Sequence, residues 1–346
     1  MAGLCAAARA RQLGLAPTVL EKGDRPGGSM LLSSGVVWRY RSLDDFRREC
    51  PTGDVGLQRQ IIERLDEGLE WLESLGARVI EKQTENPRTV GWRFEPRGLT
   101  DALVRGAGGV ELGRVPGLDP GTRPLVLATG GFGVRLARER RLVARSNPWS
   151  SGDGLDIGLD HGAATTEGMD EFFGRAMPAP PARWGEAEFV DHAQLYGRFA
   201  RITDEDGAPV SVAPEDWSEN GLVQEIARRG GLAWYLVGAD DLGRETPYGS
   251  VAEVIERARR AGAAVEERDS GAIAVHVVAA VTHTIGGLAI DERARVLDTD
   301  GRPIESLYAA GVDAGGWSTG GYASGLAAAL VFGRIAAEEI AGSPAT

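Results

Sequence analysis

The chain has 346 residues, of which 42% are hydrophobic and 25% charged, so we expect a soluble protein of about two domains, because single cores seldom grow beyond roughly 250–300 residues. The net charge of −12, with no basic stripe interleaved with aromatic residues, argues against nucleic acid as a partner. Cys5 and Cys50 have no metal-ligand spacing and no apolar run approaches the ~18 residues of a membrane span, so we expect a cytoplasmic protein without a metal site or transmembrane segment.

The beginning of the chain predicts a helix followed by a strand. Helical periodicity covers residues 1–15, and a buried strand is expected over residues 16–20, ending at Glu21. In a dinucleotide-binding βαβ unit, a glycine such as Gly3 lets the helix pack closely, and an acid in the place of Glu21 binds the adenosine ribose. We expect the first strand of that unit and its first two glycines to be missing, and a surface role remains the alternative for Glu21.

A glycine-rich turn comes next. It contains Gly27, Gly28 and Ser29, and Ser34 and Gly35 follow shortly after. Paired glycines let backbone N–H groups approach an anion such as a pyrophosphate, although a plain surface turn is the alternative.

Two helices and a strand are predicted between this turn and the middle of the chain. An amphipathic helix spans residues 56–76 and a second begins within residues 98–105. The strand at Leu125–Leu127 leads into Thr129, Gly130 and Gly131, at the carboxyl end of a strand, where open α/β sheets bind their ligands.

The second half of the chain changes character and then returns to the earlier pattern. Residues 147–265 are rich in proline and aromatic residues and show no βαβ rhythm, which predicts a second, cap-like domain. Strands are expected at residues 280–290 and 306–311, and a strong helix at residues 325–340. The amino end of that last helix, with its free N–H groups, suits the electron-rich edge of a flavin.

In this order, the segments resemble the FAD-dependent fumarate reductase and succinate dehydrogenase flavoprotein superfamily, which includes the 3-ketosteroid dehydrogenases. The resemblance is carried by VLEKGDRPGGSMLLSSG (19–35), LATGGFG (127–133), SGDGLDIGLDHGAA (151–164), THTIGGLAID (282–291) and the closing segment (307–342). It implies an α/β fold: an FAD/NAD(P)-binding Rossmann-like core of residues 1–146 plus 266–346, with an inserted α+β cap of residues 147–265.

The resemblance also implies the cofactor and its contacts. Members with covalent FAD carry a histidine where this chain has Ser33, Ser34 and Gly35, so non-covalent FAD is implied. The implied FAD contacts lie in the matching segments: Gly3, Glu21, Lys22, Gly27, Gly28, Ser29, Ser34, Gly35, Thr129, Gly130, Gly131, Asp153, Gly311, Ser324, Gly325 and Leu326.

Three residues are implied on the catalytic side. His283 and Thr284 match the pair with which fumarate reductases hold a carboxylate, but no arginine lies between Gly311 and Gly333, which counts against fumarate itself. Tyr322, two residues before Ser324, resembles the tyrosine of the 3-ketosteroid Δ4-(5α)-dehydrogenases. A tyrosine hydroxyl can polarise a ketone and so assist hydride transfer. A packing aromatic is the alternative for Tyr322, and a buried structural histidine is the alternative for His283.

The implied activity is hydride and proton transfer across a C–C bond next to a carbonyl or carboxylate. The substrate would be a small molecule, a steroid-like ketone or a carboxylate, and the sequence leaves the electron donor or acceptor open. Two alternatives remain. One is a carboxylate oxidoreductase resembling fumarate reductase or tricarballylate dehydrogenase. The other is a degenerate chain that no longer holds FAD and has no enzymatic activity.

Overall fold

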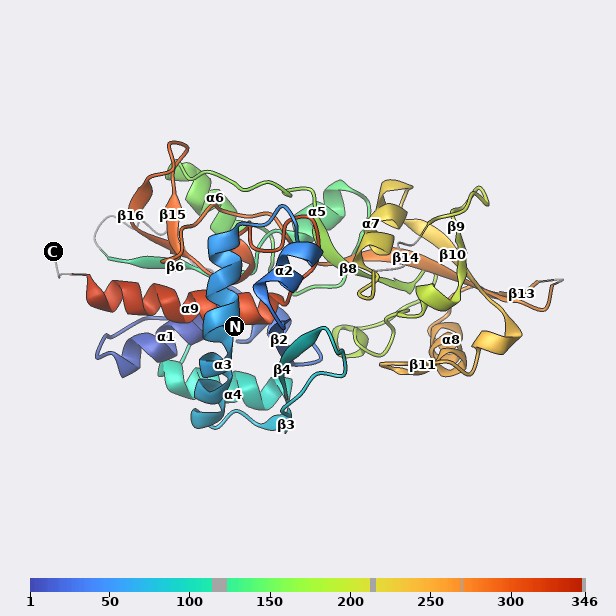
Figure 1. Cartoon of the computed structure of the whole chain (residues 1–346), viewed down its shortest axis with the longest axis horizontal. Coiled ribbons are helices and arrows are strands. Elements are labelled where there is room, and N and C mark those ends of the chain that lie inside the picture. The colour runs from blue at the N-terminus through green and yellow to red at the C-terminus, as the bar shows by residue number, and fades with distance from the viewer. Residues whose placement is uncertain (114–122, 212–215, 269, 344–346) are drawn as a thin grey trace. The chain divides into compact units, whose positions relative to one another are not determined.

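The computed structural model describes residues 1–113, 123–211, 216–268 and 270–343, which form two compact units (Figure 1). Unit 1 comprises residues 1–132, 147–171 and 283–346, and unit 2 comprises residues 133–146 and 172–282. All the predicted site residues lie in unit 1. The sequence-based boundaries at 146/147 and 265/266 differ from these bounds, and the division into cofactor and cap domains stays a prediction.

Four predicted helices of unit 1 are confirmed. They are α1 (Ala2–Gln12), α3 (Val55–Ser74), α4 (Pro96–Ala107) and α9 (Gly325–Gly342), and α1 lies beside α9 in Figure 1. A Cβ on Gly333 of α9 would lie 2.6 Å from the carbonyl oxygen of Ala2, so glycine is what lets the two backbones approach. Two short α-helices also lie in unit 1: α2 (Leu43–Glu49) and α6 (Asp153–Asp160).

Parallel pairing of β6 (Leu125–Leu127) with β16 (Pro303–Ala309) creates the edge on which the site is built. In the register Leu127 lies opposite Ala309, so the segments that follow the two strands emerge together at their carboxyl ends. β15 (Arg295–Leu297) completes this sheet, antiparallel to β16. A second sheet has the order β2 (Val36–Tyr40), β4 (Thr89–Phe94) and β3 (Val79–Glu81).

The prediction of a buried strand at residues 16–20 is wrong. Strand β1 covers only Leu20–Glu21, its single partner among the described residues is β5 (Glu111–Leu112), and Leu20 is 40% exposed. Pro17 cannot donate a ladder hydrogen bond, and a pair two residues long cannot cover an apolar face. The predicted position of Glu21 at the end of the strand is nevertheless confirmed.

The prediction of a strand at residues 280–290 is shifted. Strand β14 spans Ile273–Thr284, and the described chain beyond it forms isolated bridges and single backbone hydrogen bonds, such as the one from Ile285 N to the carbonyl oxygen of Glu171 at 3.1 Å. Just beyond the strand, Gly286 passes against the backbone of Met169, whose nitrogen lies 2.5 Å from where a Cβ on Gly286 would be. His283 and Thr284 are therefore the last two residues of a long strand, and both belong to unit 1.

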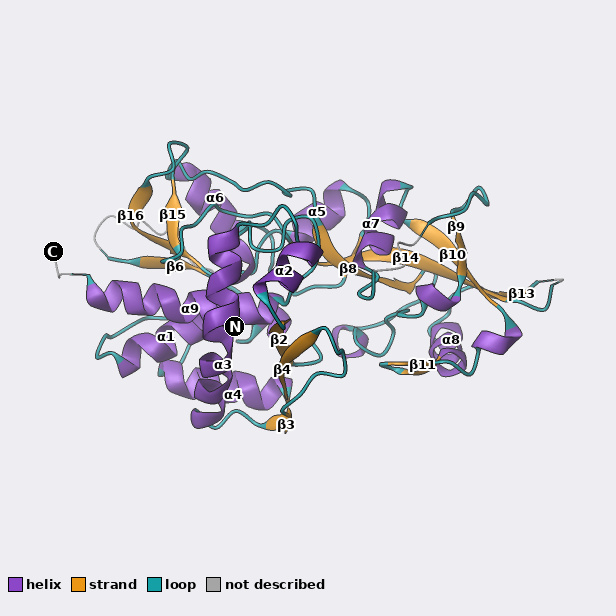
Figure 2. Ribbon diagram, in the orientation of Figure 1, coloured by secondary structure: helices purple, strands orange, loops and turns teal. Residues whose placement is uncertain are grey.

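Unit 2 is built on a six-stranded sheet of order β13–β14–β10–β9, with β7 and β8 also pairing with β14 (Figure 2). The bounds are β7 Val143–Ala144, β8 Phe172–Pro178, β9 Arg201–Thr203, β10 Leu232–Val237 and β13 Val265–Glu267. The remaining elements are α5 (Gly133–Glu139), α7 (Asn220–Arg228), α8 (Val251–Arg260) and the small ladder of β11 (Glu245–Thr246) and β12 (Gly249–Ser250). Helices and strands thus occur in both units, and the predicted α/β class is confirmed.

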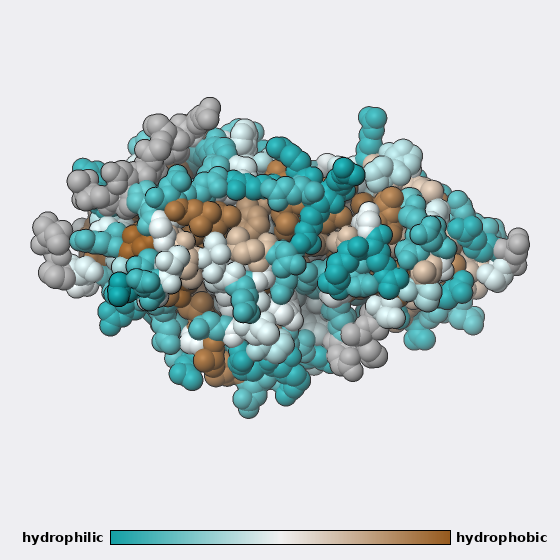
Figure 3. Space-filling view, turned by 90° about the horizontal axis from the view of Figure 1, so that it is seen from above, coloured by the Kyte–Doolittle hydropathy of each residue, from teal (hydrophilic) through white to brown (hydrophobic). Residues whose placement is uncertain are grey.

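The face of the molecule drawn in Figure 3 shows brown apolar residues in separate groups among teal hydrophilic ones. Larger apolar side chains with substantial exposure include Leu15, Leu20, Leu112 and Trp149. Within the described part of the chain, no helix combines the length and apolarity needed to span a membrane.

Candidate functional site

The turn after β6 is bonded to a buried aspartate that sequence reasoning missed. Asp313 Oδ1 accepts from Gly131 N at 3.0 Å and from Thr129 Oγ1 at 3.0 Å, and Asp313 Oδ2 accepts from Gly130 N at 3.3 Å and from Thr129 N. Asp313 is 2% exposed; burial raises the pKa of its carboxyl, and the hydrogen bonds from the turn oppose that shift. An acid two residues beyond Gly311, just after a strand, was the available signal, because the same pattern had selected Glu21.

The glycine pair of this turn is required by its surroundings. Gly130 has φ +95° and Gly131 has φ +70°, in the left-handed region that favours glycine. A Cβ on Gly130 would lie 2.9 Å from Ser150 Oγ, and one on Gly131 would lie 2.7 Å from Thr284 Oγ1. Both hydroxyl oxygens are buried and lack a hydrogen-bond partner among the described residues. The turn is therefore flanked by two hydroxyls whose bonding capacity is unused.

His283 faces the amino end of α9. Its Nδ1 lies 3.0 Å from the carbonyl oxygen of Thr284, and since a carbonyl only accepts, Nδ1 carries the hydrogen. Nε2 then has the lone pair, and it lies 3.1 Å from where a Cβ on Gly325 would be. Burial lowers the pKa of His283 to about 4, so the ring is neutral at physiological pH.

The lowered pKa of His283 predicts a pH dependence of stability. The folded pKa of about 4 lies below the usual value of 6.5, so the unfolded chain binds the proton more readily between those pH values. The contribution of the neutral ring is complete above pH 6.5 and is lost as the pH falls towards 4. His283→Gln should therefore flatten the decline in the urea midpoint over this window. His161→Gln is the control: His161 is the C-cap residue of α6, and the decline should persist in this variant. An identical decline in the wild type and in His283→Gln would show that His283 does not cause the loss of stability.

The amino end of α9 is capped by Ser324. Its Oγ accepts from Ala327 N at 3.3 Å, and the residue is 4% exposed. The cap uses Ser324 as an acceptor, whereas Gly325 and Leu326 in the first turn have backbone N–H groups without intrahelical acceptors. These two half-buried residues are thus the better placed of the three to meet a ligand.

Tyr322 is fixed by its backbone just before this helix. Its carbonyl oxygen accepts from Tyr40 Oη at 2.5 Å, and its ring meets Trp38 edge-on with centroids 5.5 Å apart. A Cβ on Gly321 would lie 1.8 Å from the carbonyl oxygen of Glu49, so the preceding residue is also closely packed. The turn therefore holds the tyrosine in one place, which suits a catalytic hydroxyl and a packing aromatic equally.

Glu21 and its neighbours form a polar cluster. Glu21 Oε1 accepts from Gly23 N at 2.8 Å. Lys22 Nζ pairs with Asp153 Oδ2 at 2.7 Å and donates to Ser151 Oγ at 2.7 Å. Lys22 and Asp153, which the sequence assigned to FAD separately, are thus joined as a partly exposed ion pair. Gly3 packs against the end of β6, because its Cβ would lie 3.3 Å from Ala128 Cβ.

The turn predicted to lie near the pyrophosphate has the backbone that glycine permits. Gly27 has φ +111° and Gly28 has φ +52°, and Ser29 Oγ accepts from Asn147 N at 3.4 Å. Gly35, at φ +75°, has no room for a side chain, because a Cβ would lie 2.0 Å from the carbonyl oxygen of Phe94. Packing alone therefore accounts for Gly35. A ligand role for these residues, and for Ser34, whose carbonyl oxygen accepts from Arg93 Nε at 3.4 Å, stays a prediction.

The structure thus brings together part of the predicted set. Gly131 lies beside Thr284 and His283 lies beside Gly325, whereas Tyr322 contacts Trp38 and Tyr40 of β2. Asp313 at the base of the turn and Ser150 beside it are additions to the set; Ser150 precedes the recognised SGDG segment by one residue and gave no signal of its own.

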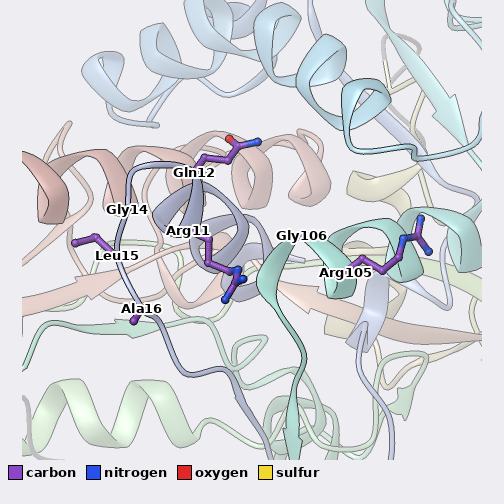
Figure 4. Close-up of a pocket in the computed structure, with 7 residues that line it drawn as sticks. All are labelled: Arg11, Gln12, Gly14, Leu15, Ala16, Arg105 and Gly106. Carbon is purple, nitrogen blue, oxygen red and sulfur yellow. The ribbon is translucent and has the colours of Figure 1, made fainter.

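A cavity of about 450 Å³ lies elsewhere in unit 1, at the carboxyl end of α1 (Figure 4). Its lining is Arg11, Gln12, Gly14, Leu15, Ala16, Arg105 and Gly106. None of these residues belongs to the predicted site, and Gly3 lies near the opposite end of the same helix.

Comparison with known proteins identifies relatives of the chain. The family model described as "FAD binding domain" matches residues 121–328, more than half of the chain. A protein named probable fumarate reductase, from Shewanella frigidimarina, is 23% identical over 98% of this chain and 73% of its own length. An NADH:acrylate oxidoreductase of Vibrio harveyi is 26% identical over 88% of this chain, which spans only 35% of that relative.

Solved structures share the fold at low sequence identity. The 3-ketosteroid-Δ4-(5α)-dehydrogenase of Rhodococcus jostii RHA1 has a TM-score of 0.71 and 18% identity, and the match covers 99% of this chain and 95% of that one. At this identity the likeness concerns the fold, and it confirms the predicted FAD-binding fold.

Proposed function

Because the chain belongs to the FAD binding domain family, within the fumarate reductase and succinate dehydrogenase flavoprotein superfamily, we propose that it transfers a hydride and a proton across a C–C bond next to a carbonyl or carboxylate. The family makes it an FAD-dependent oxidoreductase; the bond and the substrate are the proposal. FAD, when bound, supplies the two-electron donor or acceptor of this chemistry.

The residues of unit 1 fit such a cofactor. Ser150 and Thr284 offer buried hydroxyls without partners beside Gly130 and Gly131, as expected where a polar ligand completes the hydrogen bonding. Of the other residues proposed to hold FAD, Glu21 would bind the adenosine ribose, the turn from Gly27 to Ser29 would meet the pyrophosphate, and Gly325 and Leu326 would meet the flavin ring.

A ketone is the favoured substrate group, and the position of Tyr322 carries this proposal. The tyrosine lies in the turn that leads into α9, and its backbone is fixed by Tyr40 Oη. The hydroxyl of a tyrosine whose backbone is fixed can donate to a ketone oxygen, which acidifies the adjacent carbon and prepares it to exchange a proton and a hydride. A 3-ketosteroid-like substrate has such a ketone beside the reacting C–C bond.

A carboxylate substrate is the second candidate, supported by His283 and Thr284 and by the names of the two sequence relatives. The Thr284 hydroxyl is buried and available to donate. The neutral His283, however, presents a lone pair at Nε2 and cannot donate to a carboxylate from that atom without taking up a proton. The anchor is therefore weak at neutral pH, which favours the ketone.

The visible absorption spectrum of the purified protein tests the proposal first. We expect flavin absorption that passes into the supernatant after heat denaturation, because Ser33, Ser34 and Gly35 offer no histidine for a covalent link. Protein that stays colourless after incubation with FAD would support the degenerate alternative instead. Turnover of 4-androstene-3,17-dione, assayed beside fumarate, acrylate and tricarballylate with an artificial electron carrier, then decides between ketone and carboxylate. The cytoplasmic location stays a prediction and requires fractionation of the source cells.

A further inference from the structure

The backbone N–H groups of the turn after β6 are already occupied. Those of Thr129, Gly130 and Gly131 all point at Asp313, as does the Thr129 hydroxyl. A glycine-rich turn binds a phosphate when its N–H groups converge on the ligand, and here they converge on a carboxylate of the protein itself. The turn therefore cannot act as an anion site, and a phosphate beside it would also face the acidic Asp313.

A ligand at the turn after β6 would meet the Cα atoms of Gly130 and Gly131 and the two hydroxyl groups that flank them. Ser150 Oγ lies beside Gly130 and Thr284 Oγ1 beside Gly131, and both residues are at least 98% buried, with 2% and 1% exposure. Ser150 is held by its backbone, whose N–H donates to the carbonyl oxygen of Asn147 at 3.0 Å. Each hydroxyl can both donate and accept, and each lacks a protein partner among the described residues.

From these contacts we infer that Ser150 and Thr284 bind the ribityl chain of the flavin across the Gly130–Gly131 turn. This inference rests on FAD binding by the chain and goes beyond it, because it assigns a part of the cofactor to a residue, Ser150, that the motifs do not mark. The ribityl chain is a polyol, and its hydroxyl groups can both donate to and accept from the neutral hydroxyls of Ser150 and Thr284. A phosphate would instead require N–H or cationic donors.

Binding of cofactor fragments tests the assignment. The full chain, freed of flavin, is titrated with FAD, riboflavin and ADP, following flavin fluorescence for the first two and displacement of FAD for ADP. Ser150→Ala should weaken FAD and riboflavin about 5- to 30-fold, the effect of one lost hydrogen bond to a buried partner, and leave ADP unchanged. Thr284→Val should act in the same direction.

Stability of the flavin-free chain separates binding from folding. Removing a buried hydroxyl without a partner should leave the unfolding midpoint of Ser150→Ala unchanged or slightly raised, while its affinity for FAD falls. Ser146→Ala is the matched control: this hydroxyl is also buried and without a partner, but it belongs to unit 2, and its removal should leave FAD binding as it was.

Two outcomes would overturn the assignment. Equal weakening of ADP and FAD in Ser150→Ala would place the contact in the ADP half of the cofactor, and unchanged binding of all three ligands would show that the hydroxyl makes no contact. Failure of the wild-type chain to bind FAD or riboflavin would instead remove the proposed function, and the assignment with it.

Discussion

Replacing Asp313 with alanine is expected to lower the free energy of unfolding by about 3–5 kcal/mol and to abolish FAD binding at micromolar cofactor. The carboxylate accepts four hydrogen bonds from the turn after β6, and three of the donors are backbone N–H groups. A buried N–H left without an acceptor costs about 1–3 kcal/mol, although water entering the vacated space offsets part of the sum. Denaturant unfolding of the flavin-free chain measures the loss.

Asp313→Asn should cost much less than alanine. Burial leaves the pKa of the carboxyl raised, so its negative charge is not what stabilises the fold; the acceptor oxygens are. The side-chain amide of the Asp313→Asn variant keeps one oxygen that can accept hydrogen bonds from the turn after β6. For the same reason, the stability that Asp313 contributes falls as the pH rises through its folded pKa, above the ~3.9 of an ordinary aspartate.

Asp298→Ala is the control for this experiment. Asp298 also accepts backbone N–H bonds, at 2.9 Å from Asp300 and at 2.9 Å from Arg302, but those donors are exposed to solvent. Its loss should cost about 1 kcal/mol or less, because water can replace the acceptor. Equal losses in the two alanine variants would contradict the role of Asp313 in holding the turn.

Sequence reasoning succeeded where local patterns decide the structure. The helices α1, α3, α4 and α9 follow from the helical periodicity of their residues, and the predicted strand at Leu125–Leu127 is present as β6. It failed for residues 16–20, where the apolar run has too short a partner strand to be covered. Burial in a sheet depends on neighbours that the local sequence does not contain.

The site shows the same division. Gly130 and Gly131 carry a visible signal because a turn with positive φ requires glycine, whereas Asp313, which accepts their hydrogen bonds, lies 183 and 182 residues away from them in sequence. Ser150 becomes notable only when its hydroxyl is found buried without a partner. Aspartate and serine have many ordinary roles in turns and caps, so their residue types alone do not reveal such contacts.

Tyr322→Phe is expected to lower kcat for a 3-ketosteroid by about 10²- to 10⁴-fold while KM changes far less. The phenyl ring keeps the edge contact with Trp38, and the backbone carbonyl still accepts from Tyr40, so only the hydroxyl is lost. Steady-state kinetics and single-turnover flavin reduction measure the effect. Tyr248→Phe is the control, because Tyr248 packs on the apolar core of unit 2.

Tyr40→Phe separates the position of Tyr322 from its chemistry. It removes the hydroxyl that holds the Tyr322 carbonyl but leaves the Tyr322 hydroxyl in the chain, so kcat should fall by less than in Tyr322→Phe. The pH profile should keep its shape in Tyr40→Phe and change in Tyr322→Phe, because only the second variant removes the polarising O–H group. Unchanged ketone turnover in Tyr322→Phe, together with loss of carboxylate turnover in His283→Gln, would move the chemistry to His283 and make the carboxylate the substrate group.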